Sequence, residues 1–79
     1  MTVKIVSQEQ RVGLYIDGDI YDEHAESIKE IALLHARRGI KDVEIRLGTT
    51  YYISKNGQEY LFDMTSILEK QGVRVSFNS

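Results

Sequence analysis

Two kinds of apolar periodicity follow one another along the chain, and their order limits the folds that it can adopt. Short β-branched or alternating apolar runs predict four strands, at residues 3–6, 11–17, 43–47 and 73–77. Apolar spacings of three and four predict two helices, from Asp22 to Arg38 and from Asn56 to Gly72. Strands that alternate with helices favour an α/β layer whose parallel neighbours are joined by right-handed crossovers. We therefore expect residues 1–79 to form one small α/β domain of order β-β-α-β-α-β, with a mixed sheet and two helices.

The helix boundaries are predicted from residues that favour helix ends. Asp22 is a candidate N-cap for the first helix, and Gly39 is a candidate for the position that follows its end. Asn56 followed by Glu59 fits a capping box at the start of the second helix. The apolar stripes expected to face the core are Ala25, Ile28, Ile31, Ala32, Leu34 and Ala36 in the first helix and Leu61, Met64, Ile67 and Leu68 in the second. Val73, Val75 and Phe77 are expected to form the last strand.

The composition excludes several classes of function. The chain has no cysteine, which excludes a disulfide framework, a thiolate nucleophile and a zinc site built on sulfur. Ten basic and twelve acidic residues give a net charge of −2, without the basic excess that nucleic-acid binding requires. Residues 1–5 contain no long apolar run, so neither a signal peptide nor membrane insertion is predicted. We expect a cytoplasmic protein with no cofactor and no nucleic-acid partner.

The spacing of glycines, helices and strands is that of a known family. Gly18 closes the second strand, Ile20 follows two residues later, and Gly39 separates the first helix from the strand at 43–47. The tetrapeptide Ser-Lys-Asn-Gly at 54–57 then stands at the start of the second helix. Without a gap, this pattern resembles the STAS domain, the family of bacterial anti-sigma factor antagonists that also occurs at the ends of sulfate transporters.

The resemblance implies a STAS-like fold and a regulatory function without catalysis. In the family, a serine of the motif Asp-Ser-Ser-Gly is phosphorylated by regulatory kinases. The corresponding residue here is Asn56, which has no hydroxyl group to accept a phosphoryl group. Of that motif only Gly57 is kept, since Ser54 replaces its aspartate and Arg46 replaces the aspartate that ends the preceding strand. The implied protein is an interaction module that is not phosphorylatable at the family site. Its implied partner is a regulatory protein, such as a kinase-like anti-sigma factor, or a multiprotein assembly.

The start of the second helix is the predicted partner-binding surface. Unpaired N–H groups and the helix dipole attract anionic groups there, the family binds its partner at this end, and tyrosine is enriched at binding hot spots. The predicted contacts are Tyr51, Tyr52, Ser54, Lys55, Asn56, Gly57, Gln58 and Tyr60. Asn56 and Gly57 are also explained as capping residues alone, and the two interpretations are compatible. Among the tyrosines, we expect at least one in the core and another as an exposed contact.

Acidic residues crowd the segment after the second strand, and they allow two interpretations. They are Asp17, Asp19, Asp22, Glu23 and Glu26. The first two resemble the paired aspartates of haloacid-dehalogenase phosphatases, which attack phosphorus and hold magnesium. A cluster that stabilises a helix N-terminus is the simpler explanation, because those phosphatases need further motifs in a much longer chain. His24 and His35 would lie about 16 Å apart along a helix, too far to bind one metal ion.

Three functions remain open. The first is a non-enzymatic regulatory module that binds a protein partner through residues 54–60 and the adjoining face of the first helix. The second is a small accessory or phage-encoded inhibitor of a host protein, and the third is a metal-dependent enzyme that uses Asp17 and Asp19. Kinase-dependent modification of Ser54 or Ser66 would add regulation to the first function. The last strand is predicted at an exposed sheet edge, and the chain ends before the final helix of the STAS pattern, which permits a homodimer.

Overall fold

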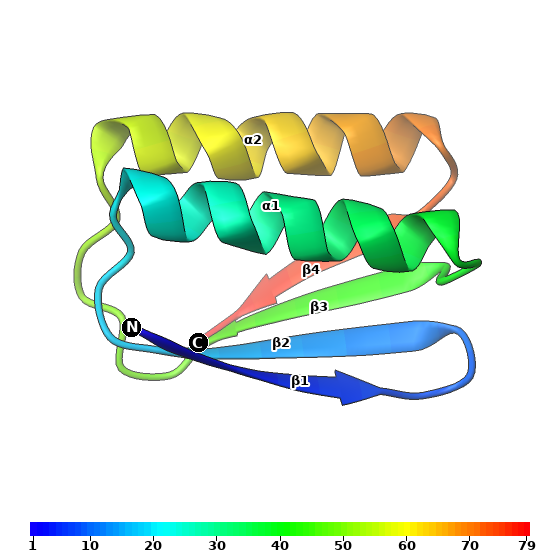
Figure 1. The fold of residues 1–79 in the computed structure, drawn as a ribbon, viewed down its shortest axis with the longest axis horizontal. Coiled ribbons are helices and arrows are strands. Elements are labelled where there is room, and N and C mark those ends of the chain that lie inside the picture. Colours follow the sequence, from blue (N-terminus) through cyan, green and yellow to red (C-terminus); the bar gives the residue numbers. More distant parts are fainter.

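The computed structural model describes residues 1–79 and contains six regular elements. The strands are β1 (Thr2–Ser7), β2 (Arg11–Asp17), β3 (Asp42–Leu47) and β4 (Arg74–Asn78), and the helices are α1 (Asp22–Arg37) and α2 (Lys55–Lys70). Their order along the chain confirms the predicted β-β-α-β-α-β arrangement (Figure 1).

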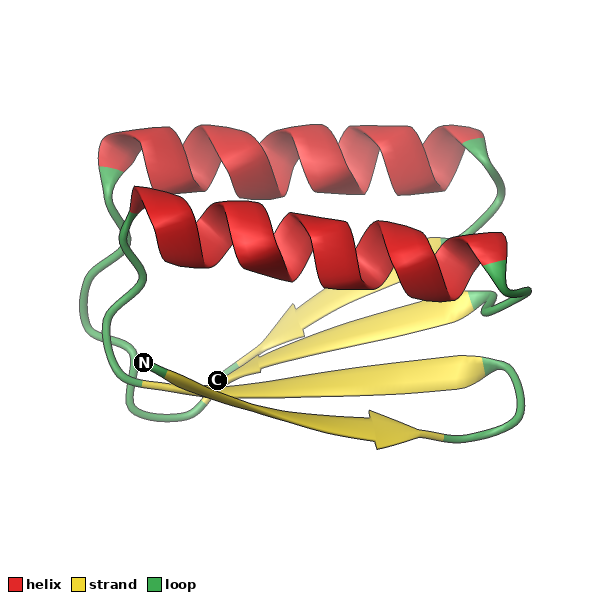
Figure 2. Ribbon diagram, viewed as in Figure 1, coloured by secondary structure: helices red, strands yellow, loops and turns green.

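The strands form one mixed sheet in the order β1-β2-β3-β4. β1 and β2 are antiparallel, as the short polar turn between them requires, whereas β2, β3 and β4 are parallel and are joined by helices. Both helices cover the same face of the sheet, and no helix covers the other face (Figure 2). Because β1 and β4 stand at the two ends of the strand order, they are the two edge strands. A membrane-spanning helix needs more length and more apolar residues than either α1 or α2 has.

The hydrophobic core lies between the helices and the covered face of the sheet. Alternate residues of the central strands, such as Leu14 and Ile45, are fully buried there. Each helix contributes one stripe, formed by Ala25, Ile28 and Ala32 of α1 and by Leu61, Met64 and Leu68 of α2. Two residues of the predicted stripes do not face the core, since Leu34 and Ile67 are exposed by 41% and 36%, and Phe77 of β4 is exposed by 43%. Leu34 faces away from the buried stripe of α1, Ile67 lies at the border of the stripe of α2, and Phe77 lies on an edge strand.

α1 begins at Asp22 as predicted, but the N-cap of each helix is a residue other than the predicted one. Tyr21 is the N-cap of α1, and Asp22 is its first helical residue. Ser54 is the N-cap of α2, so the predicted capping box that starts at Asn56 is wrong. The Ser54 hydroxyl accepts a hydrogen bond from the N–H of Gly57 at 3.0 Å, the contact that defines a serine cap. Asp22 and Asn56 therefore keep their side chains available for other partners.

The helix ends agree with the sequence. Gly39 and Gly72 follow the last turns of α1 and α2 with φ angles of 101° and 80°. This left-handed conformation closes a helix at little cost only when the residue lacks a Cβ atom. Each glycine thereby turns the chain back toward the next strand.

The open face of the sheet buries one carboxylate, that of Glu44. The Glu44 side chain accepts hydrogen bonds from Asn78 at 2.7 Å and from Arg46 at 3.3 Å, and it pairs with Arg11 at 3.2 Å. Burial acts to raise the pKa of Glu44, but these hydrogen bonds and the two positive charges outweigh it, so the pKa lies below its usual value. Arg46 also lies over the ring of Tyr15, 5.4 Å from its centroid.

Candidate protein-interaction site

The starts of α1 and α2 meet at the end of the molecule where β2 and β3 end (Figure 1). The segment 48–54 leads from β3 to α2, and its Ile53 forms a parallel bridge with Ile20, just before α1. The N–H of Ile20 donates to the carbonyl of Tyr52, and the N–H of Ser54 donates to the carbonyl of Ile20, both at 2.9 Å. This bridge holds the entries to the two helices side by side.

The carboxylate of Asp22 joins the first turns of the two helices. Its Oδ1 accepts a hydrogen bond from the Ser54 hydroxyl, and its Oδ2 accepts one from the Asn56 side-chain amide at 3.1 Å. The hydrogen bond from Ser54, and then the one from Asn56, hold the pKa of the Asp22 carboxyl below its usual value. We call these three residues the Asp22 cluster. Through it, the start of α2 already has an anion, which the chain itself supplies.

Gly57 is required by the Ser54 cap at the start of α2. A Cβ atom at this position would lie 2.7 Å from the Ser54 hydroxyl oxygen. It would also lie 3.4 Å from Ala25 of α1 and 3.4 Å from Ile53. The position is buried inside the first turn of α2. The glycine kept from the family motif is therefore explained by the space that the Ser54 cap needs.

A short loop displays two tyrosines beside the Asp22 cluster. Oδ1 of Asp19 accepts hydrogen bonds from the N–H groups of Tyr51 at 3.2 Å and Tyr52 at 3.1 Å. The ring of Tyr52 packs against that of Tyr21, with 5.6 Å between centroids. The Tyr51 side chain is 92% exposed. The Tyr51 side chain is therefore exposed to solvent, while the Asp19 carboxylate fixes the backbone that carries it.

The predicted contact residues divide into exposed and supporting groups. Tyr51, Tyr52, Lys55, Asn56 and Gln58 are exposed and lie at the same end of the molecule. Ser54 and Gly57 are buried beneath this surface. The side-chain amide of Gln58 donates to the carbonyl of Ile53 at 3.1 Å, which gives that exposed residue a local structural role as well.

Tyr60 is the tyrosine that packs against the core, as expected for at least one of them. The ammonium group of Lys29 in α1 lies 5.8 Å from its ring centroid. The neighbouring Glu26 raises the pKa of Tyr60, first by accepting its hydroxyl hydrogen bond and then through its negative charge. Tyr60 therefore connects α2 to the adjoining face of α1.

Asp17 and Asp19 are both engaged by the loop that follows β3. Asp17 accepts a hydrogen bond from the Thr49 hydroxyl at 3.3 Å, and Asp19 accepts the two N–H groups described above. No group of three or more histidine, aspartate or glutamate side chains is placed to hold a metal ion. His24 accepts the N–H of Tyr21 at 3.1 Å, beside the start of α1. These side chains stabilise the surface on which the tyrosines stand.

Several members of the site were not predicted. Sequence reasoning assigned Asp22 to its own helix, whereas the structure shows it bonded to residues more than thirty positions away. Asp19 and Tyr21 were likewise not connected with the tyrosine loop. The cluster of acids was a real signal, but pairing it with the loop required knowing that the ends of β2 and β3 are neighbours.

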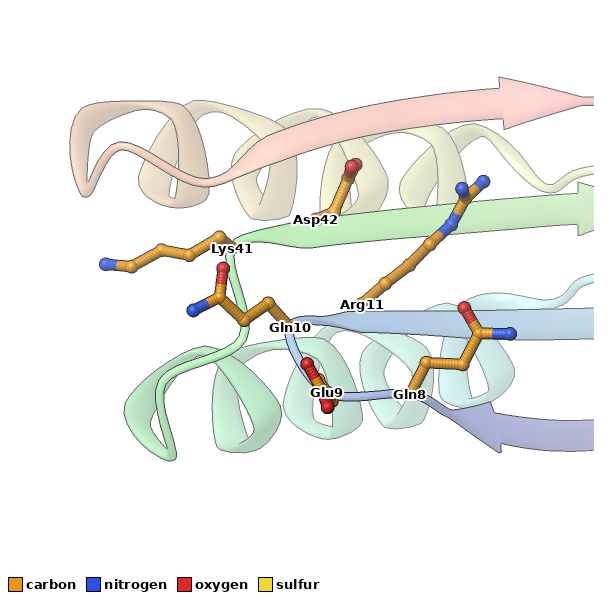
Figure 3. A pocket seen from close by; sticks show the side chains of 6 residues that line it. All are labelled: Gln8, Glu9, Gln10, Arg11, Lys41 and Asp42. Carbon is orange, nitrogen blue, oxygen red and sulfur yellow. The ribbon is translucent and has the colours of Figure 1, made fainter.

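The largest surface hollow lies at the opposite end of the sheet, about 460 Å³ beside the β1–β2 turn. Its lining includes Glu9, Arg11 and Lys41 and contains no apolar side chain. In Figure 3, Lys41 points away from Arg11, so the charged groups diverge instead of facing a common point. The charged side chains of this hollow therefore do not converge on a common ligand.

Comparison with known proteins shows the fold. No protein-family model matches the chain, and no curated protein matches it. Among solved structures, the anti-sigma factor antagonist SpoIIAA in its unphosphorylated form superposes with a TM-score of 0.78 at 12% identity, over 96% of this chain and 71% of that one. The phosphorylated form of SpoIIAA, a Bacillus cell fate determinant, gives 0.77 at 10% identity, over 94% and 68%. The chain has a STAS-like fold.

The same STAS-like fold occurs within a larger protein. A structure of Mglu superposes with a TM-score of 0.84 at 25% identity, covering 96% of this chain. The chain spans about a fifth of the length of Mglu, which has also been solved in an L-glutamate binding form. The fold is thus found both as most of a small regulator and as a minor part of a longer chain.

Proposed function

We propose that the chain is a non-enzymatic regulatory module that binds a protein partner at the start of α2. The binding surface consists of Tyr51, Tyr52, Lys55, Asn56 and Gln58, supported from below by Ser54, Gly57 and Tyr60. The observation that carries the proposal concerns Tyr51. This residue is almost fully exposed beside the start of α2, and its backbone N–H donates to the Asp19 carboxylate. Tyrosine on an ordered backbone provides large contact area at a low cost in conformational entropy.

The second part of the proposal is that binding does not depend on phosphorylation at the family site. SpoIIAA has been solved in phosphorylated and unphosphorylated forms. Here Asn56 occupies the corresponding place in the motif, and its amide donates to Asp22. The start of α2 therefore has a permanent negative charge next to it instead of one added by a kinase. Ser54 is buried and bonded to Asp22, so modifying its hydroxyl would require the Asp22 cluster to open.

The proposed partner is a regulatory protein, with a kinase-like anti-sigma factor or a multiprotein assembly as the two classes. The likeness to SpoIIAA supports the first class. The proposed setting is the bacterial cytoplasm, because SpoIIAA is a Bacillus regulator. A partner that contacts Lys55 and the tyrosines should itself present acidic and apolar groups.

A pull-down from host lysate, followed by quantitative mass spectrometry, tests the proposal. The binding variant combines Tyr51→Ser with Lys55→Glu, because neither side chain makes a hydrogen bond within the chain and an acid at a helix start is favourable. The control is Lys41→Glu, which makes the same charge change at the distant hollow. We expect one protein to be captured by wild type and control, and to be lost at least tenfold with the binding variant.

The identity of the captured protein then separates the alternatives. A sigma-regulatory protein would support the module as proposed, whereas a host enzyme whose activity falls on binding would indicate an inhibitor. Equal capture by the wild type and the binding variant, with both folded by circular dichroism, would contradict the proposed surface.

A further inference from the structure

The edge formed by β4 and the outer side of α2 differs from the rest of the surface because it is apolar. Phe62 of α2 is 78% exposed, and Phe77 of β4 lies next to it. Together with Gln58, Leu61 and Thr65 these residues line a groove of about 360 Å³. Isolated exposed apolar residues are ordinary, but two phenylalanines lining one groove beside an open sheet edge form a patch that favours contact with another surface.

The two edges of the sheet are not equivalent. β1 has a lysine, Lys4, near its centre, and a charged residue on an edge strand opposes pairing with another strand. β4 has no charge at its three central positions, Val75, Ser76 and Phe77. Only β4 therefore combines an undefended edge with an apolar groove.

The backbone of β4 has hydrogen-bonding groups that the chain leaves free. The N–H of Arg74 donates to the carbonyl of Lys41 at 2.9 Å, so at this residue the polar backbone groups point toward β3. Because these groups alternate along a strand, those of Val75 and Phe77 point outward from the sheet. A strand that pairs with β4 must therefore bond to these two residues.

We propose that the partner of this edge is a second copy of the chain, joined to the first through antiparallel pairing of β4 with β4. Centred on Ser76, this register places Val75 opposite Phe77 of the second copy, and Phe77 opposite Val75. Each pair exchanges two backbone hydrogen bonds, so every outward-pointing group of these residues is satisfied. The proposal does not depend on the proposed function, because it is argued from the β4 edge and Phe62; Gln58 alone belongs to both surfaces.

The side chains also suit this register. Val75 and Phe77 are in register with Val43 and Ile45, so they lie on the helix-covered face and form apolar cross-strand pairs in the dimer. On the open face, Arg74 lies opposite Asn78 of the second copy, and Ser76 lies opposite Ser76. No charged residue of β4 faces a like charge.

A stable dimer needs a larger contact than the edge of β4 provides, and the exposed Phe62 lies where α2 would supply it. Stable interfaces bury about 800 Å² on each partner, which is about a sixth of the 5052 Å² of this chain. A five-residue strand edge is too small alone, so the outer side of α2 must take part. The two-fold axis brings both α2 helices to the same side of an eight-stranded sheet, with Phe62 of each copy beside the junction.

Sedimentation equilibrium across about 1 to 100 µM, a range that detects micromolar association, tests the proposal. We expect wild type to change from 9.1 kDa to twice that mass. Ser76→Lys places two lysines opposite each other at the centre of the pairing, and we expect it to raise the dimer dissociation constant at least tenfold. Phe62→Ser, which removes an exposed side chain from α2, should do the same without altering the sheet.

The matched control is Ser7→Lys, which adds the same charge to the other edge strand, and it should leave the dissociation constant unchanged. Circular dichroism confirms that each variant is folded. Wild type that stays at 9.1 kDa over the whole range would overturn the proposal and assign this face to a different occupant. A dimer weakened equally by Ser7→Lys, or unaffected by both β4 and α2 variants, would also overturn it.

Discussion

Oδ2 of Asp22 accepts a hydrogen bond from the side-chain amide of Asn56 at 3.1 Å, between residues 34 positions apart in the sequence. This contact connects the start of one helix to the start of the next. It also gives Asn56 a function that a serine, with a shorter side chain and a hydroxyl, would not perform in the same way. The proposed binding surface depends on this arrangement.

Replacing Ser54 by alanine removes the N-cap of α2 and one of the two hydrogen bonds to Asp22. We expect a loss of about 1 kcal/mol in the free energy of unfolding and a decrease in Tm of roughly 4–8 °C for a domain of this size. Thermal unfolding followed by circular dichroism measures both. Ser66→Ala, an exposed change within the same helix, is the control and should leave Tm nearly unchanged. Equal effects of the two variants would contradict the role of Ser54.

The effect of Gly57→Ala on the free energy of unfolding is expected to change sign when Ser54 is replaced by alanine. In wild type, the added Cβ would displace the Ser54 hydroxyl, which lies 2.7 Å away, so the loss of the cap should outweigh the gain in helix propensity of about 1 kcal/mol. In a Ser54→Ala background that hydroxyl is absent, and the same change should stabilise the protein. Urea unfolding of the four proteins in this double-mutant cycle measures the coupling. A Gly57→Ala effect of the same sign in both backgrounds would show that close approach to Ser54 is not the cause.

The lowered pKa of Asp22 predicts how stability depends on pH. Because the carboxylate is favoured in the folded state, its contribution is complete above the ordinary value of 3.8 and is lost as pH falls through the lower folded value. Asp22→Asn should therefore be less stable than wild type at pH 7, and the difference should shrink as pH falls below 3.8. Unfolding by urea at pH 7 and at several pH values below 3.8 tests the sign. A difference that grows in acid would be inconsistent with a depressed pKa.

Asp19→Ala should loosen the tyrosine loop without unfolding the sheet. The N–H groups of Tyr51 and Tyr52 would lose their shared acceptor and turn to water. We expect the backbone order parameters of both residues to fall below about 0.6 in NMR relaxation, while those of the strands stay near 0.85. Asp63→Ala, an exposed change on α2, serves as the control. Unchanged order at Tyr51 would mean that the loop is held by other contacts.

Much of the fold follows from local patterns that the sequence shows directly. The alternation in β2 and β3 and the apolar stripe of α1 each depend on a periodicity of a few residues, so the elements and their order were predicted correctly. Gly39 was predicted for the same reason, since a residue after a helix is judged on its own conformation. The error at Leu34 arose because a residue's surroundings decide its burial: Leu34 is apolar but lies on the far side of α1.

In the candidate site too, features set by residue type were predicted, whereas features set by contacts between distant residues were not. The exposed tyrosines and Gly57 could be selected from residue type and from the family resemblance. The cap of α2 was placed at Asn56 because asparagine and glutamate three residues apart imitate a capping box, whereas Ser54 makes the bond. The partnership of Asp22 with Ser54 and Asn56 depends on β2 and β3 being neighbours, a relationship that no local pattern contains.

Site-specific photo-crosslinking at position 51 tests directly whether a partner binds at the start of α2. A photoreactive phenylalanine analogue replaces Tyr51 in one protein and Glu9, at the opposite end of the sheet, in its control. We expect position 51 to become linked in host lysate to a single protein. Excess unlabelled wild type should suppress this link, whereas excess Tyr51→Ser, Lys55→Glu protein should not suppress it. Linkage of the same protein from position 9, or none from position 51, would contradict binding at the start of α2.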